Sequence, residues 1–280
     1  MKQAFAYLNA KRFVIYGFML LLLLLAVLPV YIMTINATRS TNQINLGLSL
    51  IPGTNILFNW EILTRHGVDI GQGFINSSIV SFSTVILAIY FTALTAYGLH
   101  CYHFPGRRII WTVILVTMML PASLGFIGFY QFMALLKLTN NYLPLIIPAI
   151  AGSATVLFIR QYMSSMLSVE LIDAARIDGA GEFRIFNQIV IPIISPALAA
   201  QAIFTFVGSW NNFFTPFVLI SNQKKYTLPL QINLLRSDLY RTEFGAIYLG
   251  LAISIIPIII FFCFVSRYII SGITLGGIKE

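Results

Sequence analysis

The chain has 280 residues, of which 58% are hydrophobic and only 9% are charged, and its mean hydropathy is +0.87. A soluble domain has about 25% charged residues, so this chain lacks the charge needed to cover a water-exposed surface. The formal net charge is +8, but the cations are scattered and flank apolar stretches, which favours lipid headgroups over nucleic acid as the anionic partner. The composition therefore predicts a polytopic membrane protein that binds no nucleic acid.

Six uncharged stretches are long enough to cross about 30 Å of hydrocarbon as helices. They are residues 13–34, 74–99, 109–132, 142–159, 193–220 and 245–266. Their length and uniform apolarity exclude barrel strands. The first stretch follows basic residues, as a signal peptide does, but it exceeds the usual apolar core of about 7–15 residues. We therefore predict an uncleaved first span, a tail at 1–12 and a single transmembrane domain at 13–280.

Basic residues predict the orientation of these spans. The N-terminal tail carries Lys2, Lys11 and Arg12, and the short turn before the third span carries Arg107 and Arg108. Short basic segments lie preferentially on the cytoplasmic side. With six spans, this predicts that both termini and the segment 160–192 are cytoplasmic.

The segment 160–192 is unusually polar for so apolar a chain. Ser168 is a candidate N-cap for a short helix, and Gly179 and Gly181 are expected to end it because glycine tolerates a left-handed turn. Residues 182–190 can form a second helix, and Pro192 suits the first turn of the next span. This pattern predicts a helix–turn–helix that docks on a partner; the alternative is an amphipathic segment without one.

Residues 170–180 resemble the EAA loop of binding-protein-dependent ABC importer permeases. The family pattern is EAA, three residues, Gly, nine residues, then Ile-x-Leu-Pro. The chain matches every spacing, with Asp173 in place of Glu and Ile191 in place of Leu. Because Asp is one methylene shorter than Glu, an ion pair to the ATPase could be rearranged. The Ala-Arg-Ile-Asp-Gly-Ala sequence of the loop is similar to that of the carbohydrate-uptake branch, the maltose-permease G type.

Further family markers follow in the same order along nearly the whole chain. They are Asn76-Ser77, Ala96-Tyr97, Leu120-Pro121, Ser209-Trp210-Asn211, Tyr226-Thr227-Leu228-Pro229 and Arg267-Tyr268. Each is weak alone, but their shared order is specific. The resemblance implies an all-α membrane protein with six transmembrane helices, the type I ABC-importer permease fold and cytoplasmic EAA coupling helices.

The resemblance also implies partners and a mechanism. A second permease, expected to be a different chain, would complete the translocation path in the bacterial cytoplasmic (inner) membrane. Two ATPase subunits would hold ATP and Mg²⁺, and an extracytoplasmic binding protein would deliver the solute. This chain has no G-x-x-x-x-G-K-[ST] loop. We therefore expect a non-catalytic subunit without cofactor or metal, moved by rigid-body alternating access.

The family's coupling residues transfer to this chain position by position. They are Glu170, Asp173, Ala174, Ala175, Asp178, Gly179, Ile189 and Pro192. Asp173 would contact a cationic ATPase residue, the two alanines would permit close packing, and Gly179 would make the turn. The substitution Gly179→Asp is therefore expected to uncouple transport.

The translocation path is less clear from the sequence. None of the predicted spans carries a charged residue at its middle, which argues against an ion-coupled carrier and for a neutral or weakly polar solute. Gln131, Trp210, Asn211 and Asn212 are candidate solute contacts, because amides donate and accept as sugar hydroxyls require. The alternative for the aromatic residues is ordinary packing.

Two other classes of protein remain as alternatives. A self-sufficient secondary transporter is disfavoured by the lack of intramembrane charge and visible inverted repeats. A membrane enzyme is disfavoured because the chain has no H-E-x-x-H and no G-x-S-x-G pattern. The residues do not distinguish a monosaccharide, a longer sugar or glycerol phosphate as the solute.

The loop 221–244 is predicted to face the binding protein; its charged residues are Lys224, Lys225, Arg236, Asp238, Arg241 and Glu243.

Overall fold

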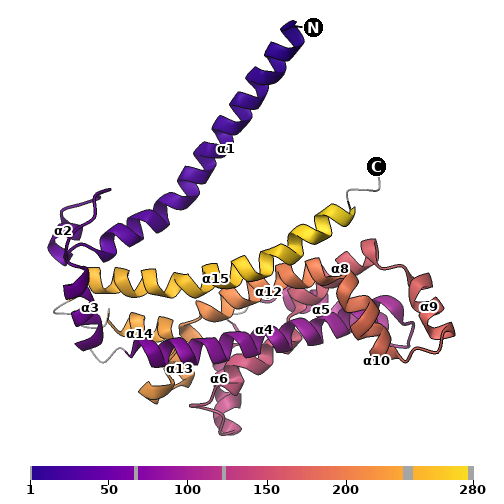
Figure 1. Cartoon of the computed structure of the whole chain (residues 1–280). Helices are drawn as coiled ribbons and strands as arrows, with labels where there is room; N and C mark the ends of the chain where they lie inside the picture. Colours follow the sequence, from indigo (N-terminus) through magenta and orange to yellow (C-terminus); the bar gives the residue numbers. More distant parts are fainter. Residues whose placement is uncertain (1, 66–68, 122–123, 236–241, 277–280) are drawn as a thin grey trace. The chain divides into compact units, whose positions relative to one another are not determined.

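The computed structural model describes residues 2–65, 69–121, 124–235 and 242–276, and all regular structure within them is helical (Figure 1). This confirms the all-α prediction. Contacts divide the chain into two compact units. Unit 1 comprises Met1–Asp69 and Ile232–Ile255, and unit 2 comprises Ile70–Gln231 and Ile256–Glu280.

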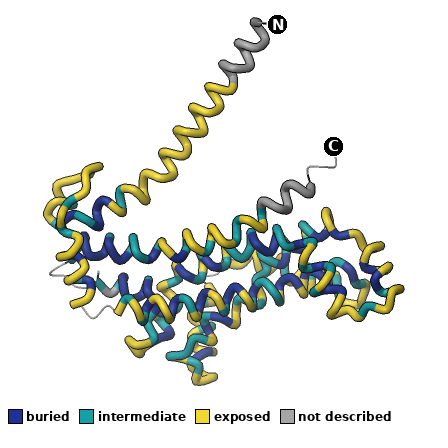
Figure 2. Tube along the Cα trace, viewed as in Figure 1, coloured by how far each residue is buried: buried dark blue, intermediate teal, exposed yellow. Residues whose placement is uncertain are grey.

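Unit 1 contains α1 (Lys2–Ala37), α2 (Thr41–Asn45), α3 (Ile56–Arg65) and the first part of α15 (Phe244–Gly276). Polar contacts organise the end of α1. The buried Arg39 guanidinium donates to Asn36 Oδ1 and to the Gly47 carbonyl, both at 3.1 Å. The Asn59 amide donates to the carbonyls of Ala37 and Arg39. By contrast, the apolar side chains of residues 13–31 are exposed (Figure 2), as lipid contact requires.

Unit 2 is built on α4 (Ile70–Cys101), against which α8 (Ser153–Met166), η1 (Ile147–Ala151) and α12 (Ser195–Trp210) pack (Figure 1). The other helices are α5 (Arg107–Met119), α6 (Phe126–Leu135), α7 (Leu143–Ile146), α9 (Val169–Ile177), α10 (Glu182–Ile185), η2 (Phe186–Val190), α11 (Ile191–Ile193), α13 (Phe214–Leu219), η3 (Gln223–Lys225) and α14 (Leu228–Leu234), whose last residues belong to unit 1. The rest of α15 completes the unit.

The described helices overlap several of the predicted spans, and they do not establish the count of six. Among the described residues, four segments are long and apolar enough to cross a membrane: Arg12–Ala37, Ile70–Cys101, Leu143–Met166 and Phe244–Ile269. A fifth is possible if α10 to α12, which bend by 80° between Ile193 and Ser195, count as one span.

Two predicted spans are interrupted. The stretch 109–132 is divided between α5 and α6, because α5 ends at Met119 before Leu120, whose backbone is extended ahead of Pro121. The stretch 193–220 is divided between α12 and α13, which are separated by Asn211 to Phe213. Uniform apolarity along a sequence does not reveal such breaks, because the side chains on both sides of each break are equally apolar.

Candidate functional site

A buried cluster fixes the loop 160–192 to the end of α4. From the loop it contains Ile172 and Ala175 of α9 together with Ile185, Phe186 and Val190. Their partners on the core helices include Ala96, Tyr97, Leu99, Cys101, Val156, Ile159 and Met163. We call this cluster the joint. Phe186 is 1% exposed and its ring packs edge-on to Tyr90 and against Tyr97, with centroids 5.6 and 5.4 Å apart. The joint therefore makes α9, α10 and the end of α4 one packed body.

A polar network completes the joint at its edge. The hydroxyls of Tyr97 and Tyr102 both donate to the Glu182 carboxylate, the former at 3.0 Å. Arg176 donates from Nε to Glu182 at 2.6 Å and from a terminal nitrogen to Asp173 at 2.7 Å. These partners, Glu182 first, raise the pKa of Arg176. One carboxylate thus connects α9, α10 and α4.

The opposite face of α9 and α10 is open. We call residues 168–185 the knob. At its surface Ile177 is 87% exposed and Phe183 is 75% exposed. Gly179 adopts φ +81°, and a Cβ built there would meet no atom within 4 Å. The knob thus presents two large apolar side chains beside a glycine whose open side faces away from its own chain.

The predicted coupling residues lie on different sides of this loop. Glu170, Asp173, Ala174, Asp178, Gly179 and Pro192 are exposed. Ala175 is buried in the joint and Ile189 is half-buried, so their side chains pack inward. Ser168 occupies the N-cap position of α9, but its hydroxyl donates to the Glu170 carboxylate instead of capping the backbone. The predicted helix 182–190 is one α-helical turn followed by a π-helix.

Two family markers that are distant in sequence meet in unit 2. The buried Asn76 amide donates to the carbonyls of Lys224 and Tyr226 at 2.8 and 2.9 Å. The neighbouring Ser77 hydroxyl accepts the backbone N–H of Leu228 at 2.9 Å. These bonds attach the Tyr226–Pro229 segment to α4, and they explain why an amide and a hydroxyl stand at adjacent positions.

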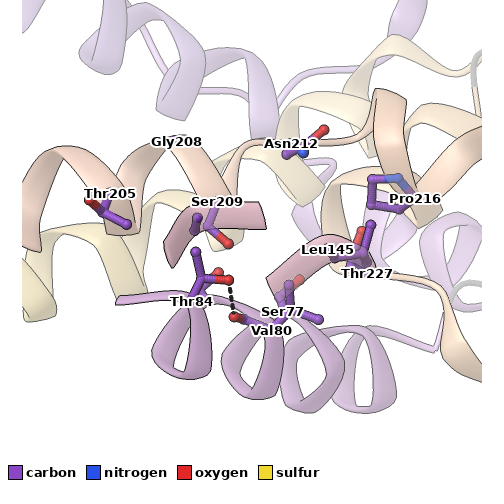
Figure 3. A pocket seen from close by; sticks show the side chains of 12 residues that line it. Ser77, Val80, Thr84, Leu145, Thr205, Gly208, Ser209, Asn212, Pro216 and Thr227 are labelled. Atoms are coloured by element: carbon purple, nitrogen blue, oxygen red, sulfur yellow. Dashed lines mark hydrogen bonds between the residues drawn. The ribbon is translucent and has the colours of Figure 1, made fainter. Parts of the chain in front are cut away.

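Beside this attachment lies a pocket of about 250 Å³ (Figure 3). Its polar lining comes from α4 on one side and from α12 and the residues that follow it on the other. These side chains are Ser77, Ser81, Thr84, Thr205, Ser209, Asn212 and Thr227. Val80, Leu145, Ala149 and Pro216 add apolar surface, and none of the described residues that line this pocket is charged.

Of the predicted path residues, Asn212 lines this pocket. Its amide is already engaged with Thr215, accepting the backbone N–H and donating to the hydroxyl, both at 3.1 Å, which caps the start of α13. Trp210 is 1% exposed and packs against Phe74 and Phe206, so packing, the alternative stated for it, describes its surroundings. Gln131 and Asn211 are exposed and lie outside the lining of the pocket.

The hydroxyls of α4 that line the pocket are not among the residues predicted for the translocation path. Ser77, Ser81 and Thr84 are spaced i, i+4 and i+7, which places them on one face of a helix. That spacing was available in the sequence. It indicates a polar stripe on a predicted span, but it does not reveal that Ser209 and Thr227 face the same space.

The fold and the loop define an integral membrane subunit of a transporter. Residues 98–274 match the model of the family described as binding-protein-dependent transport system inner membrane component, so the chain belongs to that family. It is a multi-pass membrane protein and a non-catalytic subunit, as predicted. Family membership decides against the secondary transporter and the membrane enzyme.

Relatives resemble the chain over nearly its full length. It is 37% identical over 259 residues to the arabinooligosaccharides transport system permease protein AraQ of Halalkalibacterium halodurans, covering 91% of this chain and 92% of the relative. Its identity to AraQ of Bacillus subtilis is 32%, covering 94% of both chains. It is 30% identical to the diacetylchitobiose uptake system permease protein NgcG of Streptomyces coelicolor, covering 96% and 90%.

A solved structure shares the fold. It is titled as a bacterial ABC transporter involved in the import of the acidic polysaccharide alginate, and one of its chains matches with a TM-score of 0.73. The sequence identity is 24%, and the match covers 95% of this chain and 96% of the other. At this identity the likeness establishes the fold alone.

Proposed function

We propose that this chain is one of two permease subunits of an ATP-driven importer for a neutral oligosaccharide, and that its knob docks on a cytoplasmic ATPase subunit. The second permease, two ATPases carrying ATP and Mg²⁺, and an extracytoplasmic binding protein complete the assembly. Both termini and the loop 160–192 lie on the cytoplasmic side in this proposal.

The observation that carries the proposal is the two-sided build of the knob. Its inner face is packed into the joint, while Ile177 and Phe183 are exposed on its outer face. Large apolar side chains that are exposed on a polar loop are typical of a protein interface. Because Gly179 leaves room for close approach, a cleft in the ATPase can receive the knob, and a movement of the knob is passed directly to α4.

The substrate class rests on two observations. The described pocket has hydroxyls and an amide but no charged group, and a neutral solute needs no counter-charge. The relatives with the names AraQ and NgcG are permeases for arabinooligosaccharides and diacetylchitobiose. A neutral sugar therefore fits this chain better than glycerol phosphate, although relatives named for sn-glycerol-3-phosphate transport are 27% identical to it.

A matched pair of glycine variants tests the docking. Gly179 and Gly106 both have a positive φ, +81° and +88°, and a Cβ at either position meets no atom within 4 Å. Aspartate therefore strains both turns similarly, and it is among the residues that tolerate this region best. Gly106 lies in the turn before α5, outside the knob.

The measurement is co-purification of the tagged chain with a second permease and an ATPase subunit co-expressed from the same organism, followed by uptake in proteoliposomes. Gly179→Asp should lower ATPase retention and uptake at least about 10-fold, whereas Gly106→Asp should retain both. Full retention and uptake by Gly179→Asp would refute docking through the knob. Uptake of radiolabelled arabinotriose, with sn-glycerol 3-phosphate as the charged comparison, tests the substrate class.

The loop 221–244 is proposed to face the binding protein. Its described charged residues are Lys224, Lys225 and Glu243; Arg236, Asp238 and Arg241 lie outside the described residues. Lys225 donates from Nζ to the Asn140 carbonyl at 2.7 Å, so it also holds the loop to its own unit. Replacing the exposed Lys224 with glutamate should weaken stimulation of the ATPase by the binding protein.

A further inference from the structure

The pocket beside α4 contains hydroxyls that lack a hydrogen-bond partner. Ser81 is 0% exposed and Thr227 is 4% exposed, both line the pocket, and the side-chain oxygen of each has no partner within the described residues. A buried hydroxyl without a partner costs about 1–3 kcal/mol. Two such groups in the wall of one pocket call for an explanation, and a ligand bound in the pocket would supply their partners.

The remaining lining shows what chemistry that occupant has. Thr84 lines the pocket and donates its hydroxyl proton to the Val80 carbonyl at 2.7 Å (Figure 3), so its oxygen can act only as an acceptor toward another molecule. Ser77 accepts the Leu228 N–H, which leaves its proton available to donate. The pocket therefore offers both donors and acceptors at short spacing without any net charge, as a polyhydroxylated neutral molecule requires.

The volume of the pocket limits how large a ligand it can hold. Sites for drug-sized ligands measure about 300–1,000 Å³, and this pocket measures about 250 Å³. It suits one sugar ring and not a whole oligosaccharide. Leu145, Ala149 and Pro216 supply the apolar surface on which the C–H face of a ring can pack.

We infer that this pocket is a binding subsite for a single neutral sugar unit, held by the hydroxyls of Ser81 and Thr227. The inference deepens the proposed function, on which it rests for the kind of solute. It assigns direct solute contact to this subunit, and it places that contact at α4 instead of at Gln131, Trp210 or Asn211.

The test removes the two unpaired hydroxyls in the assembled importer. In Ser81→Ala/Thr227→Val the protein loses no hydrogen bond of its own, so its thermal stability should be unchanged or higher. Thr92→Val is the matched control, because Thr92 is a fully buried hydroxyl on the same helix whose bond goes to the Ala88 carbonyl, outside the pocket. This control separates an effect of the pocket from a general effect of losing a hydroxyl.

Two readouts are needed. The first is uptake of arabinotriose at saturating binding protein. The second is thermal stabilisation of the purified complex by 100 mM L-arabinose without binding protein, a single ring that reports on the pocket directly. The double variant should lower uptake about 10-fold, as the loss of two neutral hydrogen bonds predicts, and it should lose stabilisation by arabinose, whereas Thr92→Val retains both.

A second pair fills the space. A Cβ at Gly208, which lines the pocket, or at Gly98, which does not, meets no atom within 4 Å. Gly208→Leu should abolish stabilisation by arabinose and Gly98→Leu should not. Unchanged stabilisation in the double variant and in Gly208→Leu would overturn the subsite and leave a water-filled pocket. A wild-type complex that binds arabinose but takes up no arabinotriose would refute the proposed substrate while supporting the subsite.

Discussion

The two halves of α4 differ in how their polar groups are treated. Near its C-terminal end, the hydroxyl of Tyr97 is paired with Glu182 and its ring is packed against Phe186. In its N-terminal half, Ser81 is equally buried, but its hydroxyl has no hydrogen-bond partner among the described residues, and it borders a pocket. A filled and paired interface transmits movement, because close-packed interiors deform little. The pocket beside Ser81 is instead where we propose that the sugar unit binds. One helix thus carries a rigid joint at one end and a candidate binding site at the other.

The largest effect is expected in the joint. Phe186→Ala should destabilise the protein by about 3–5 kcal/mol, because it leaves a cavity in a filled core. Phe183→Ala, three residues earlier and 75% exposed, should leave stability unchanged while weakening ATPase retention. The buried Cys101 reports unfolding by thiol labelling during heating, in a Cys263→Ser background that removes the exposed thiol. Equal stability of the two alanine variants would contradict the rigid joint.

The attachment beside the pocket should show the next largest effect. Asn76→Asp preserves shape but replaces the two donors to the Lys224 and Tyr226 carbonyls with acceptor atoms. The loss should be about 3 kcal/mol, since two bonds are broken and a charge is buried. The same labelling assay measures it. Asn141→Asp, on the half-exposed Asn141, is the control and should be nearly neutral.

A smaller effect is expected from the carboxylate of the joint. Glu182→Gln weakens the bonds from Arg176 and the two tyrosines. Since the Glu182 side chain is 46% exposed, screening limits the loss of stability to about 1 kcal/mol. Coupling should suffer more than stability, as shown by ATP hydrolysis that continues while uptake falls. Asp173→Asn, whose side chain is 56% exposed, should change stability by less than about 0.5 kcal/mol. Tight coupling in Glu182→Gln would restrict the network to a structural role.

The smallest effect is expected within the pocket wall. Thr84→Val removes one hydrogen bond, to the Val80 carbonyl, and should cost less than about 1 kcal/mol, because the carbonyl retains its helical partner. Uptake of arabinotriose should fall about 2- to 5-fold if the Thr84 oxygen accepts from the solute. If Thr84→Val lowers the stability but leaves the uptake of arabinotriose unchanged, this threonine supports the helix only.

Much of the backbone structure of the loop 160–192 was predictable, because it depends on residues that are close together in the sequence. The turn at Gly179 is expected wherever glycine follows a short helix, and the structure has φ +81° there. The Ser168 side chain was predicted less well. As an N-cap its hydroxyl would accept a backbone N–H, whereas in the structure it donates to the Glu170 carboxylate. Both roles are open to a serine at this position, and the sequence does not decide between them. The inward direction of Ala175 was also hidden, since Ala174 and Ala175 are chemically identical and only packing distinguishes them.

The sequence alone determined the membrane class, the family and the position of the polar loop 160–192, because composition, apolar run length and motif spacing are properties of a linear chain. The tertiary structure decided which residues meet. It brought Glu182 to Tyr97, 85 residues away, and Thr227 to the pocket beside Ser81. Such encounters depend on how helices pack, and helix packing depends on the shapes of many side chains together.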